Sequence, residues 1–271
     1  MTFLYFLSII FIGVLSGFLA GLLGIGGGIV IIPSLYFLYS FFPHPHSEYL
    51  SQCILGTSNG IILINSVKNF HNYYKQGLLS IKNTVKFAGA GLVGGIFGGR
   101  VASLMNSDSL KVFLGIFLLL MGIKMFFPNK KKNSNNFILS NYKMGFFTFA
   151  SIGVIVGFFS GFFGIGGGVL AVPILTTFCK IPIIFAQGFS VSLIPFNKIG
   201  GVIGYISGGM NKIGFNLPFV GFMDISLVLI CGIAGGFSTS LGLRTARKIN
   251  QLKLQKIFSV ILMIVAVKII F

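Results

Sequence analysis

The sequence predicts an all-α polytopic membrane protein made of two related halves, and three observations lead to this fold class. Hydrophobic residues make up 55% of the chain and charged residues only 8%, whereas about a quarter of the residues in a soluble domain are charged. Apolar segments recur along the whole sequence, with short polar connections between them. A glycine-rich motif occurs twice, as GFLAGLLGIGGGIVIIP at 17–33 and as GFFSGFFGIGGGVLAVP at 157–173.

Ten apolar segments account for most of the 271 residues. They are expected at 3–23, 27–42, 50–67, 84–106, 109–127, 144–163, 167–184, 186–207, 217–240 and 253–271. The first is too long for a signal-peptide core and has no basic residue ahead of it, so we expect a retained helix. The second and seventh are short and are predicted as full spans or as half-helices, which gives eight to ten membrane crossings.

The repeat extends beyond the glycine motif and indicates one gene duplication. Asn65 matches Asn197 at an offset of 132, and Arg100 matches Arg244 at an offset of 144. The predicted parts are an N-terminal transmembrane repeat (1–127), a basic linker (128–143) and a C-terminal transmembrane repeat (144–271). Five segments per half, an odd number, predict that the second half is inverted relative to the first. With eight spans the halves are parallel instead.

The positive charge of the chain is explained by membrane topology. The formal net charge is +17, but the basic residues lie mostly at segment ends and in short loops, without the clustered face that nucleic-acid binding requires. If all ten segments cross, 15 of the 20 lysines and arginines fall on the side of the linker. The positive-inside rule then puts the linker in the cytoplasm and both termini outside. Lys198 is counted among the five basic residues of the opposite side.

Paired glycine interruptions in apolar sequence predict a binding site. A broken helix is tolerated in hydrocarbon only where it is buried in protein or faces a wet cavity, and matching breaks in two halves indicate a transporter's binding site. Bare N–H groups at a helix N-terminus favour an anion. We therefore predict a small anionic substrate held by backbone donors and nearby hydroxyls and amides. The predicted substrate-binding residues are Gly24, Gly26, Gly27, Gly28, Thr57, Ser58, Asn65, Gly164, Gly166, Gly167, Gly168, Ser190, Ser192 and Asn197.

A packing interpretation of the same residues stays open. Small residues let membrane helices approach closely, which is the expected role of the flanking glycines at 17, 21, 157 and 161 and of the stripe at 91, 95 and 99. A hydroxyl in a membrane helix often bonds its own backbone instead of a ligand. Arg100 and Arg244, at the ends of apolar segments, are expected to anchor the protein at the interface.

No metal, cofactor or catalytic site is predicted. The chain has three acidic residues, Glu48, Asp108 and Asp224, too few to build a carboxylate relay through a membrane. The PHPH stretch at 43–46 is an incomplete metal site and is predicted to be a solvated loop. The GIGGG run is not a GxGxxG fingerprint, and no nucleophile, base and orienting residue converge as an enzyme would need. The three cysteines are isolated and are expected to be free thiols.

The duplicated GxGGG-to-proline pattern, the small polar stretches at 56–58 and 188–192, and the glycine-rich fourth segment of each half resemble the TauE/SafE sulfite exporter family. That family is also called the toluene-sulfonate uptake permease family. The resemblance covers nearly the whole chain. It implies a multi-pass transporter in a bacterial-type inner membrane for small sulfur-containing or organic anions, such as sulfite, thiosulfate or sulfonates. An anion channel and a membrane-embedded sulfur-relay or assembly partner remain alternatives, and the sequence leaves the oligomeric state open.

Overall fold

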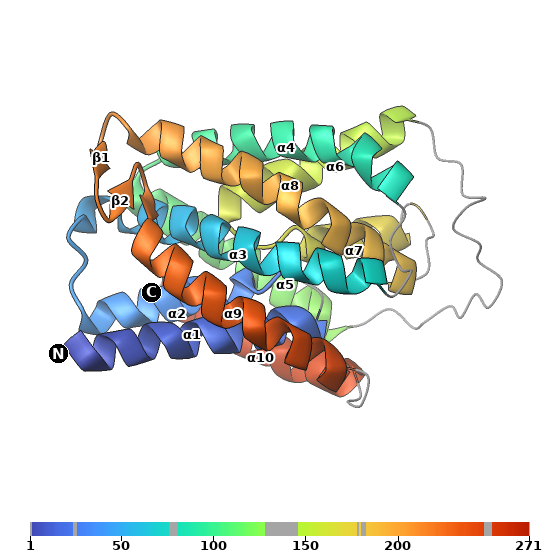
Figure 1. Ribbon diagram of the computed structural model, residues 1–271, viewed down its shortest axis with the longest axis horizontal. Helices are drawn as coiled ribbons and strands as arrows, with labels where there is room; N and C mark the ends of the chain where they lie inside the picture. The colour runs from blue at the N-terminus through green and yellow to red at the C-terminus, as the bar shows by residue number, and fades with distance from the viewer. Residues whose placement is uncertain are drawn as a thin grey trace.

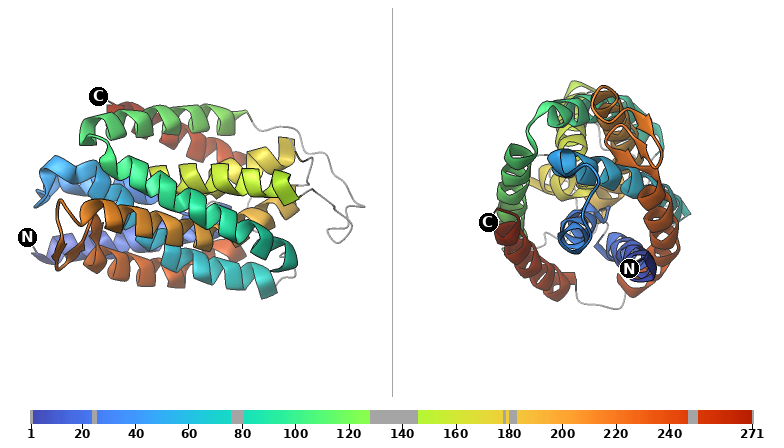
Figure 2. Two further views of the ribbon diagram at one scale, coloured as in Figure 1. Left: turned by 90° about the horizontal axis from the view of Figure 1, so that it is seen from above. Right: turned by 90° about the vertical axis from the view of Figure 1, so that its left-hand side faces the viewer.

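The computed structural model describes residues 2–23, 26–75, 81–127, 146–177, 179, 183–246 and 251–270. Within these ranges the chain forms ten α-helices, one for each predicted apolar segment. They are α1 (Thr2–Leu23), α2 (Gly28–Phe41), α3 (Leu50–Lys75), α4 (Ile81–Leu104), α5 (Ser107–Phe126), α6 (Phe146–Phe163), α7 (Gly168–Thr177), α8 (Ile183–Gly209), α9 (Ile225–Ala246) and α10 (Gln251–Ile270). The helices lie along one long axis, and α1 begins and α10 ends at the same end of the bundle (Figures 1 and 2).

Several predicted boundaries differ from the structure, and the end of α3 and the start of α9 differ most, by eight residues each. Helix α3 continues to Lys75, eight residues past the predicted end at 67, and one face of this extension stays buried, with Asn69 1% and Tyr73 7% exposed. Residues 217–224, predicted as part of the ninth segment, belong to a small antiparallel sheet of β1 (Phe215–Asn216), β2 (Phe219–Val220) and β3 (Met223–Asp224). Gly221, at φ +56°, allows the tight turn between β2 and β3.

Helix α9 begins at Ile225 because Asp224 caps it. The Oδ1 atom of Asp224 accepts a hydrogen bond from the backbone N–H of Leu227 at 3.1 Å. A carboxylate at this position satisfies one of the N–H groups that a helix N-terminus leaves without a partner. The aspartate expected near the start of the ninth segment is therefore a structural cap.

The bundle buries a set of polar side chains among apolar ones and has an apolar exterior. The apolar windows of α3 and α8 are 78% and 72% buried, against 33% for α1 and 28% for α5. Outward-facing side chains such as Phe11, Phe113 and Phe237 are more than half exposed, whereas α3 and α8 bury serines, asparagines and a lysine. This distribution suits a lipid bilayer and would not suit water.

Five described helices are long and apolar enough to cross a membrane: Phe3–Leu22, Ser47–Lys75, Ser107–Phe126, Ala186–Gly209 and Ile225–Thr245. Helices α2 and α7 have 14 and 10 residues, so at 1.5 Å per residue they are about 21 and 15 Å long. The hydrocarbon core of a bilayer is about 30 Å thick. Neither short helix can cross it alone.

Small residues bring the helices together across the two halves. Helix α1 packs on α9, α4 on both α6 and α8, α3 on both α8 and α9, and α5 on α10. A Cβ on Gly17 would collide with the carbonyl oxygen of Gly235, and one on Gly98 would collide with the carbonyl oxygen of Phe158. The other flanking and stripe glycines at 21, 91, 94, 95, 99, 157 and 161 also face a neighbouring helix closely. The predicted packing role of these glycines is confirmed.

Within the PHPH loop Pro43 and Pro45 are exposed, but His44 is buried, so the prediction of a solvated loop is wrong at His44. This side chain is 8% exposed, and its ring packs edge-on against Tyr39 and Phe219, with ring centroids 4.6 and 5.4 Å away. Its Nδ1 atom accepts a hydrogen bond from the backbone N–H of His46 at 3.0 Å. Burial lowers the pKa of His44 to about 4. Aromatic residues of β2 and α2 cover the His44 ring, and nothing in the local sequence signals that contact.

Candidate functional site

The two glycine motifs meet inside the bundle. Helix α1 ends at Leu23 and α6 at Phe163, and in each case the next helix begins within five residues. A Cβ on Gly26 would lie 2.9 Å from the Cα of Gly166, and one on Gly28 would lie 2.7 Å from the carbonyl oxygen of Gly164. The backbones of the two loops are therefore in direct contact, and neither of these positions has room for a side chain. Gly24 lies outside the described residues.

Apolar side chains surround the point where the loops touch. Ile62 of α3 and Ile194 of α8 are buried, and both lie within 3.6 Å of the position that a Gly26 Cβ would occupy. The two isoleucines match at the same offset of 132 as Asn65 and Asn197. Polar contacts must therefore come from the flanks of the crossing.

Each loop delivers the N-terminus of a short helix into the interior. The carbonyl oxygen of Gly27 accepts hydrogen bonds from Val30 and Ile31 at 3.0 and 3.2 Å, and that of Gly167 accepts from Leu170 and Ala171 at 3.2 and 2.8 Å. These bonds close the first turns of α2 and α7. The N–H groups ahead of them have no partner within their helix and carry partial positive charge.

Unpartnered polar groups gather beside Gly167. A Cβ at this position would lie 3.0 Å from Nδ2 of Asn197 and 3.4 Å from Oγ of Ser160. Both side chains are at most 1% exposed. In the described part of the chain, neither amide atom of Asn197 nor the Ser160 hydroxyl has a hydrogen-bond partner. A buried polar group left unpaired costs about 1–3 kcal/mol, and such groups mark places where a ligand or water binds.

Lys198 is the functional candidate that the sequence reasoning missed. Its side chain is 0% exposed in α8, and Nζ donates hydrogen bonds to Oδ1 of Asn59 at 2.9 Å and to the carbonyl oxygen of Ser160 at 2.7 Å. None of the three acidic residues is among these partners. The interpretation of Lys198 as an anchor at the membrane surface is therefore wrong. Its place inside the predicted segment 186–207, next to a recurring asparagine, is the signal that points to function.

The other predicted ligands have varied surroundings. Ser58 donates to the carbonyl oxygen of Gly164 at 2.9 Å and so ties α3 to the second loop. The Thr57 hydroxyl accepts the N–H of Asp224 at 3.0 Å, at the start of α9. Ser192 bonds the carbonyl of Phe189 in its own helix at 2.7 Å. These three hydroxyls already have protein partners.

Asn65 and Ser190 are buried without hydrogen-bond partners in the described chain. The amide of Asn65 lies against Gly235 of α9, where a Cβ would be 2.6 Å from Oδ1, whereas the amide of Asn197 lies against Gly91 of α4. The matched asparagines thus occupy matched contacts. Arg100 and Arg244 are exposed, in agreement with the anchoring role expected of them.

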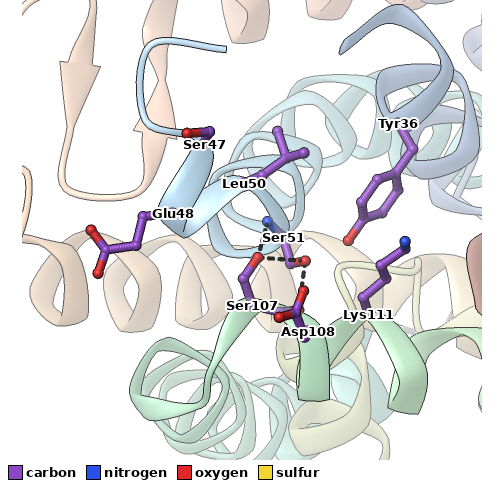
Figure 3. Close-up of a pocket in the computed structure, with 8 residues that line it drawn as sticks. All are labelled: Tyr36, Ser47, Glu48, Leu50, Ser51, Ser107, Asp108 and Lys111. Atoms are coloured by element: carbon purple, nitrogen blue, oxygen red, sulfur yellow. Dashed lines mark hydrogen bonds between the residues drawn. The ribbon is translucent and has the colours of Figure 1, made fainter. Parts of the chain in front are cut away.

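A separate pocket of about 340 Å³ lies at one end of the bundle, between α2 and the starts of α3 and α5 (Figure 3). Its lining residues are Tyr36, Ser47, Glu48, Leu50, Ser51, Ser107, Asp108 and Lys111. Ser51 and Ser107 bond each other through their hydroxyls at 2.9 Å, and Glu48 points away from Tyr36 and Lys111 (Figure 3). None of the predicted ligands lines this pocket. Among the described residues, no cluster of His, Cys, Asp or Glu could hold a metal ion.

An apolar exterior, a set of buried polar side chains and several helices able to span a bilayer define a multi-pass membrane protein. The chain belongs to the sulfite exporter TauE/SafE family, whose model matches residues 9–269. It is therefore a membrane transporter by family.

Curated relatives agree with this class. The chain is 32% identical over 255 residues to a probable membrane transporter protein of Methanocaldococcus jannaschii, covering 94% of this chain and 91% of the relative. It is 28% identical to the probable membrane transporter protein YunE of Bacillus subtilis, covering 98% and 97% of the two chains. A probable membrane transporter protein of Haemophilus influenzae is 29% identical, with 98% of each chain covered. No solved structure matches this chain.

Proposed function

We propose that this protein carries a small sulfur-containing or organic anion, such as sulfite, thiosulfate or a sulfonate, and binds it beside the crossing of the two glycine loops. The observation that carries the proposal is the group of unpartnered, buried donors next to Gly167, at the N-terminus of α7. Helix N-termini attract anions through free N–H groups and partial positive charge.

The charge distribution favours an anion over a cation. A cation site would need carboxylates or several free carbonyl oxygens. The three acidic residues are Glu48 and Asp108 near the end pocket and Asp224 at the start of α9, away from the glycine loops in sequence. Lys198, which a bound anion would hold in its protonated form, would add positive charge close to Ser160.

Inverted halves would place this site on the boundary between the two repeats. In Figure 1, α3 and α8, which the duplication makes equivalent, run in opposite directions along the bundle. The α1–α9 and α4–α6 contacts are likewise equivalent when the halves are exchanged. Both observations support an inverted repeat with paired glycine breaks, and not the parallel halves considered for eight spans, although α2 and α7 are too short to cross the bilayer alone. Transporters of that design alternate access by moving one repeat against the other.

The experiment is uptake of labelled sulfite, thiosulfate and taurine into proteoliposomes. Wild type is compared with Gly167→Val, which fills the space beside Asn197, and with Gly236→Val, where a Cβ meets nothing within 4 Å. We expect saturable uptake of at least one anion by wild type and Gly236→Val, and its loss in folded Gly167→Val. Flux that never saturates would favour a channel, and uptake of none of these anions by wild type would reject the proposed substrate class.

A further inference from the structure

The two glycine loops have the same GIGGG sequence but different chemistry around them. A Cβ on Gly27 would lie 3.1 Å from the Cβ of Ala20, and a Cβ on Gly167 would lie 3.4 Å from the Oγ of Ser160. Ala20 and Ser160 match at the offset of 140 that relates the two glycine motifs. A methyl group in the first half thus takes the place of a hydroxyl in the second.

The central helices show the same asymmetry. Asn65 of α3 is followed by Ser66, whereas its counterpart Asn197 is followed by Lys198. Ser66 is buried and donates to the carbonyl of Leu63 in its own helix at 2.8 Å. At this matched position, a basic residue is present in the second half and a serine in the first.

Lys198 is held in place by Asn59. The Nδ2 of Asn59 donates to the carbonyl oxygens of Leu55 at 2.9 Å and Gly161 at 3.2 Å, which leaves its Oδ1 to accept from Lys198. When a bound anion keeps Lys198 protonated, its ammonium has three N–H donors, and two of them have acceptors here. Asn59 is thus a positioning residue, and one donor of Lys198 is available to a ligand.

Ser160 connects this ammonium to the glycine loop. Its carbonyl oxygen accepts from Lys198 at 2.7 Å, while its unpartnered hydroxyl lies on the side of Gly167 together with the Asn197 amide. A buried charge needs an opposite charge as well as hydrogen bonds to offset its desolvation. The partners of Lys198 here are neutral oxygen atoms, so a protonated Lys198 requires a negative charge beside it, which an anionic substrate would supply.

We infer that the two half-sites are not equivalent, and that Lys198, Ser160 and Asn197 of the second half hold the charged group of the substrate. This inference rests on the proposed function and deepens it. The first half-site, with Ala20 and Ser66 at the matching positions, contributes backbone and packing. One ammonium and the partial charge of the α7 N-terminus match one formal negative charge, so the site selects a monoanionic oxyanion, such as an alkylsulfonate, over a dianion.

The test compares methanesulfonate with sulfate in proteoliposomes and in calorimetric titrations of the purified protein. The variants are Lys198→Met, Lys198→Arg and Ser160→Ala. The controls are Ser66→Ala, at the matching position of the first half, and Lys68→Met, an exposed lysine of α3. Wild type is expected to bind methanesulfonate at least about tenfold more tightly than sulfate.

Lys198→Met is expected to weaken methanesulfonate binding about 30-fold or more, because the bound anion loses its buried partner of opposite charge. Lys198→Arg keeps the charge and is expected to retain the preference for the monoanion. Ser160→Ala is expected to raise KM about fivefold to tenfold, because a hydrogen bond to a charged group is lost. Ser66→Ala and Lys68→Met are expected to match wild type.

The inference fails if folded Lys198→Met keeps the wild-type KM and the wild-type ratio of methanesulfonate to sulfate. If Lys198→Met does not fold, Ser160→Ala and Ser66→Ala are compared instead. Equal effects of these two variants on KM would overturn the proposed asymmetry. If Lys198 had only a structural role, its substitution would change the protein yield, but Lys198→Arg and Lys198→Met would show the same preference for methanesulfonate over sulfate. Wild type that transports no anion would instead reject the proposed function, so the two failures are distinguishable.

Discussion

Matched alanine substitutions at Gly27 and Gly167 are predicted to have opposite consequences, although the two residues occupy the same position in the repeated motif. Gly27 has φ +77°, and an L-residue in that left-handed region costs about 1–2 kcal/mol. A Cβ there would also lie 2.8 Å from the carbonyl oxygen of Ser16, and overpacking of this kind costs about 1–3 kcal/mol. Gly27→Ala is therefore expected to lose about 2–5 kcal/mol of stability.

Gly167→Ala is expected to spare stability and damage binding. Gly167 is not among the glycines with positive φ, and its added methyl would meet side chains at 3.0–3.4 Å that can shift by a few tenths of an ångström. Two of those side chains are Asn197 and Ser160. Displacing one hydrogen bond to a charged ligand costs about 1.5–3 kcal/mol, which corresponds to a rise in KM of about 10-fold to 100-fold.

The assay pairs thermal unfolding in detergent with transport. Unfolding is followed by the reaction of the buried thiols of Cys53 and Cys231 with a fluorogenic reagent. Gly27→Ala is expected to lower Tm by roughly 5–10 °C, and Gly167→Ala to change Tm by less than about 3 °C while raising KM. Equal shifts in both quantities for the two variants would refute the assignment of backbone strain to one loop and ligand contact to the other.

Three further predictions concern the scaffold. Gly17→Val is expected to cost more than about 3 kcal/mol, because its Cβ collides with Gly235 of α9, and Tm in detergent against a Gly236→Ala control measures it. The pKa of His44 is lower in the folded protein, at about 4, than in the unfolded chain. The stability that the neutral side chain contributes is therefore fully present above pH 6.5 and is lost as the pH falls from 6.5 towards 4. That loss is on the order of 2 kcal/mol, and a His44→Phe variant is expected to show a shallower fall of Tm over this range. Asp224→Ala is expected to cost about 1 kcal/mol through loss of the α9 cap, and a Tm equal to that of wild type would disprove the capping role.

Much of the fold could be predicted from the sequence because its signals are local. Long apolar segments separated by polar loops predicted the helices, and the spacing of Gly91, Gly95 and Gly99 predicted close packing, which the structure places against α8. The sheet at 215–224 was missed because Phe219, Val220 and Met223 are as apolar as the helix that follows. Gly221, in the last turn of the sheet, and Asp224, the cap of α9, are the residues that mark where the sheet ends and the helix begins.

The candidate site was harder to predict because burial is a property of packing. Lysine is normally counted as a topology marker, and nothing in the residue itself distinguishes Lys198 from exposed Lys68. The difference comes from α3, where Asn59 supplies the acceptor, and from α6, where the Ser160 carbonyl supplies another. The glycines and Asn197 were predictable because the duplication repeats them, whereas Lys198 and Ser160 have no counterpart in the first half.

The most direct test of the central claim is crystallographic location of selenite, the selenium analogue of sulfite, by its anomalous signal in the purified protein. We predict a single strong peak within hydrogen-bond distance of Ser160 Oγ and Asn197 Nδ2, beside Gly167. A peak confined to the end pocket near Lys111, or the absence of any peak at the glycine loops in protein that transports selenite, would contradict the proposed binding site.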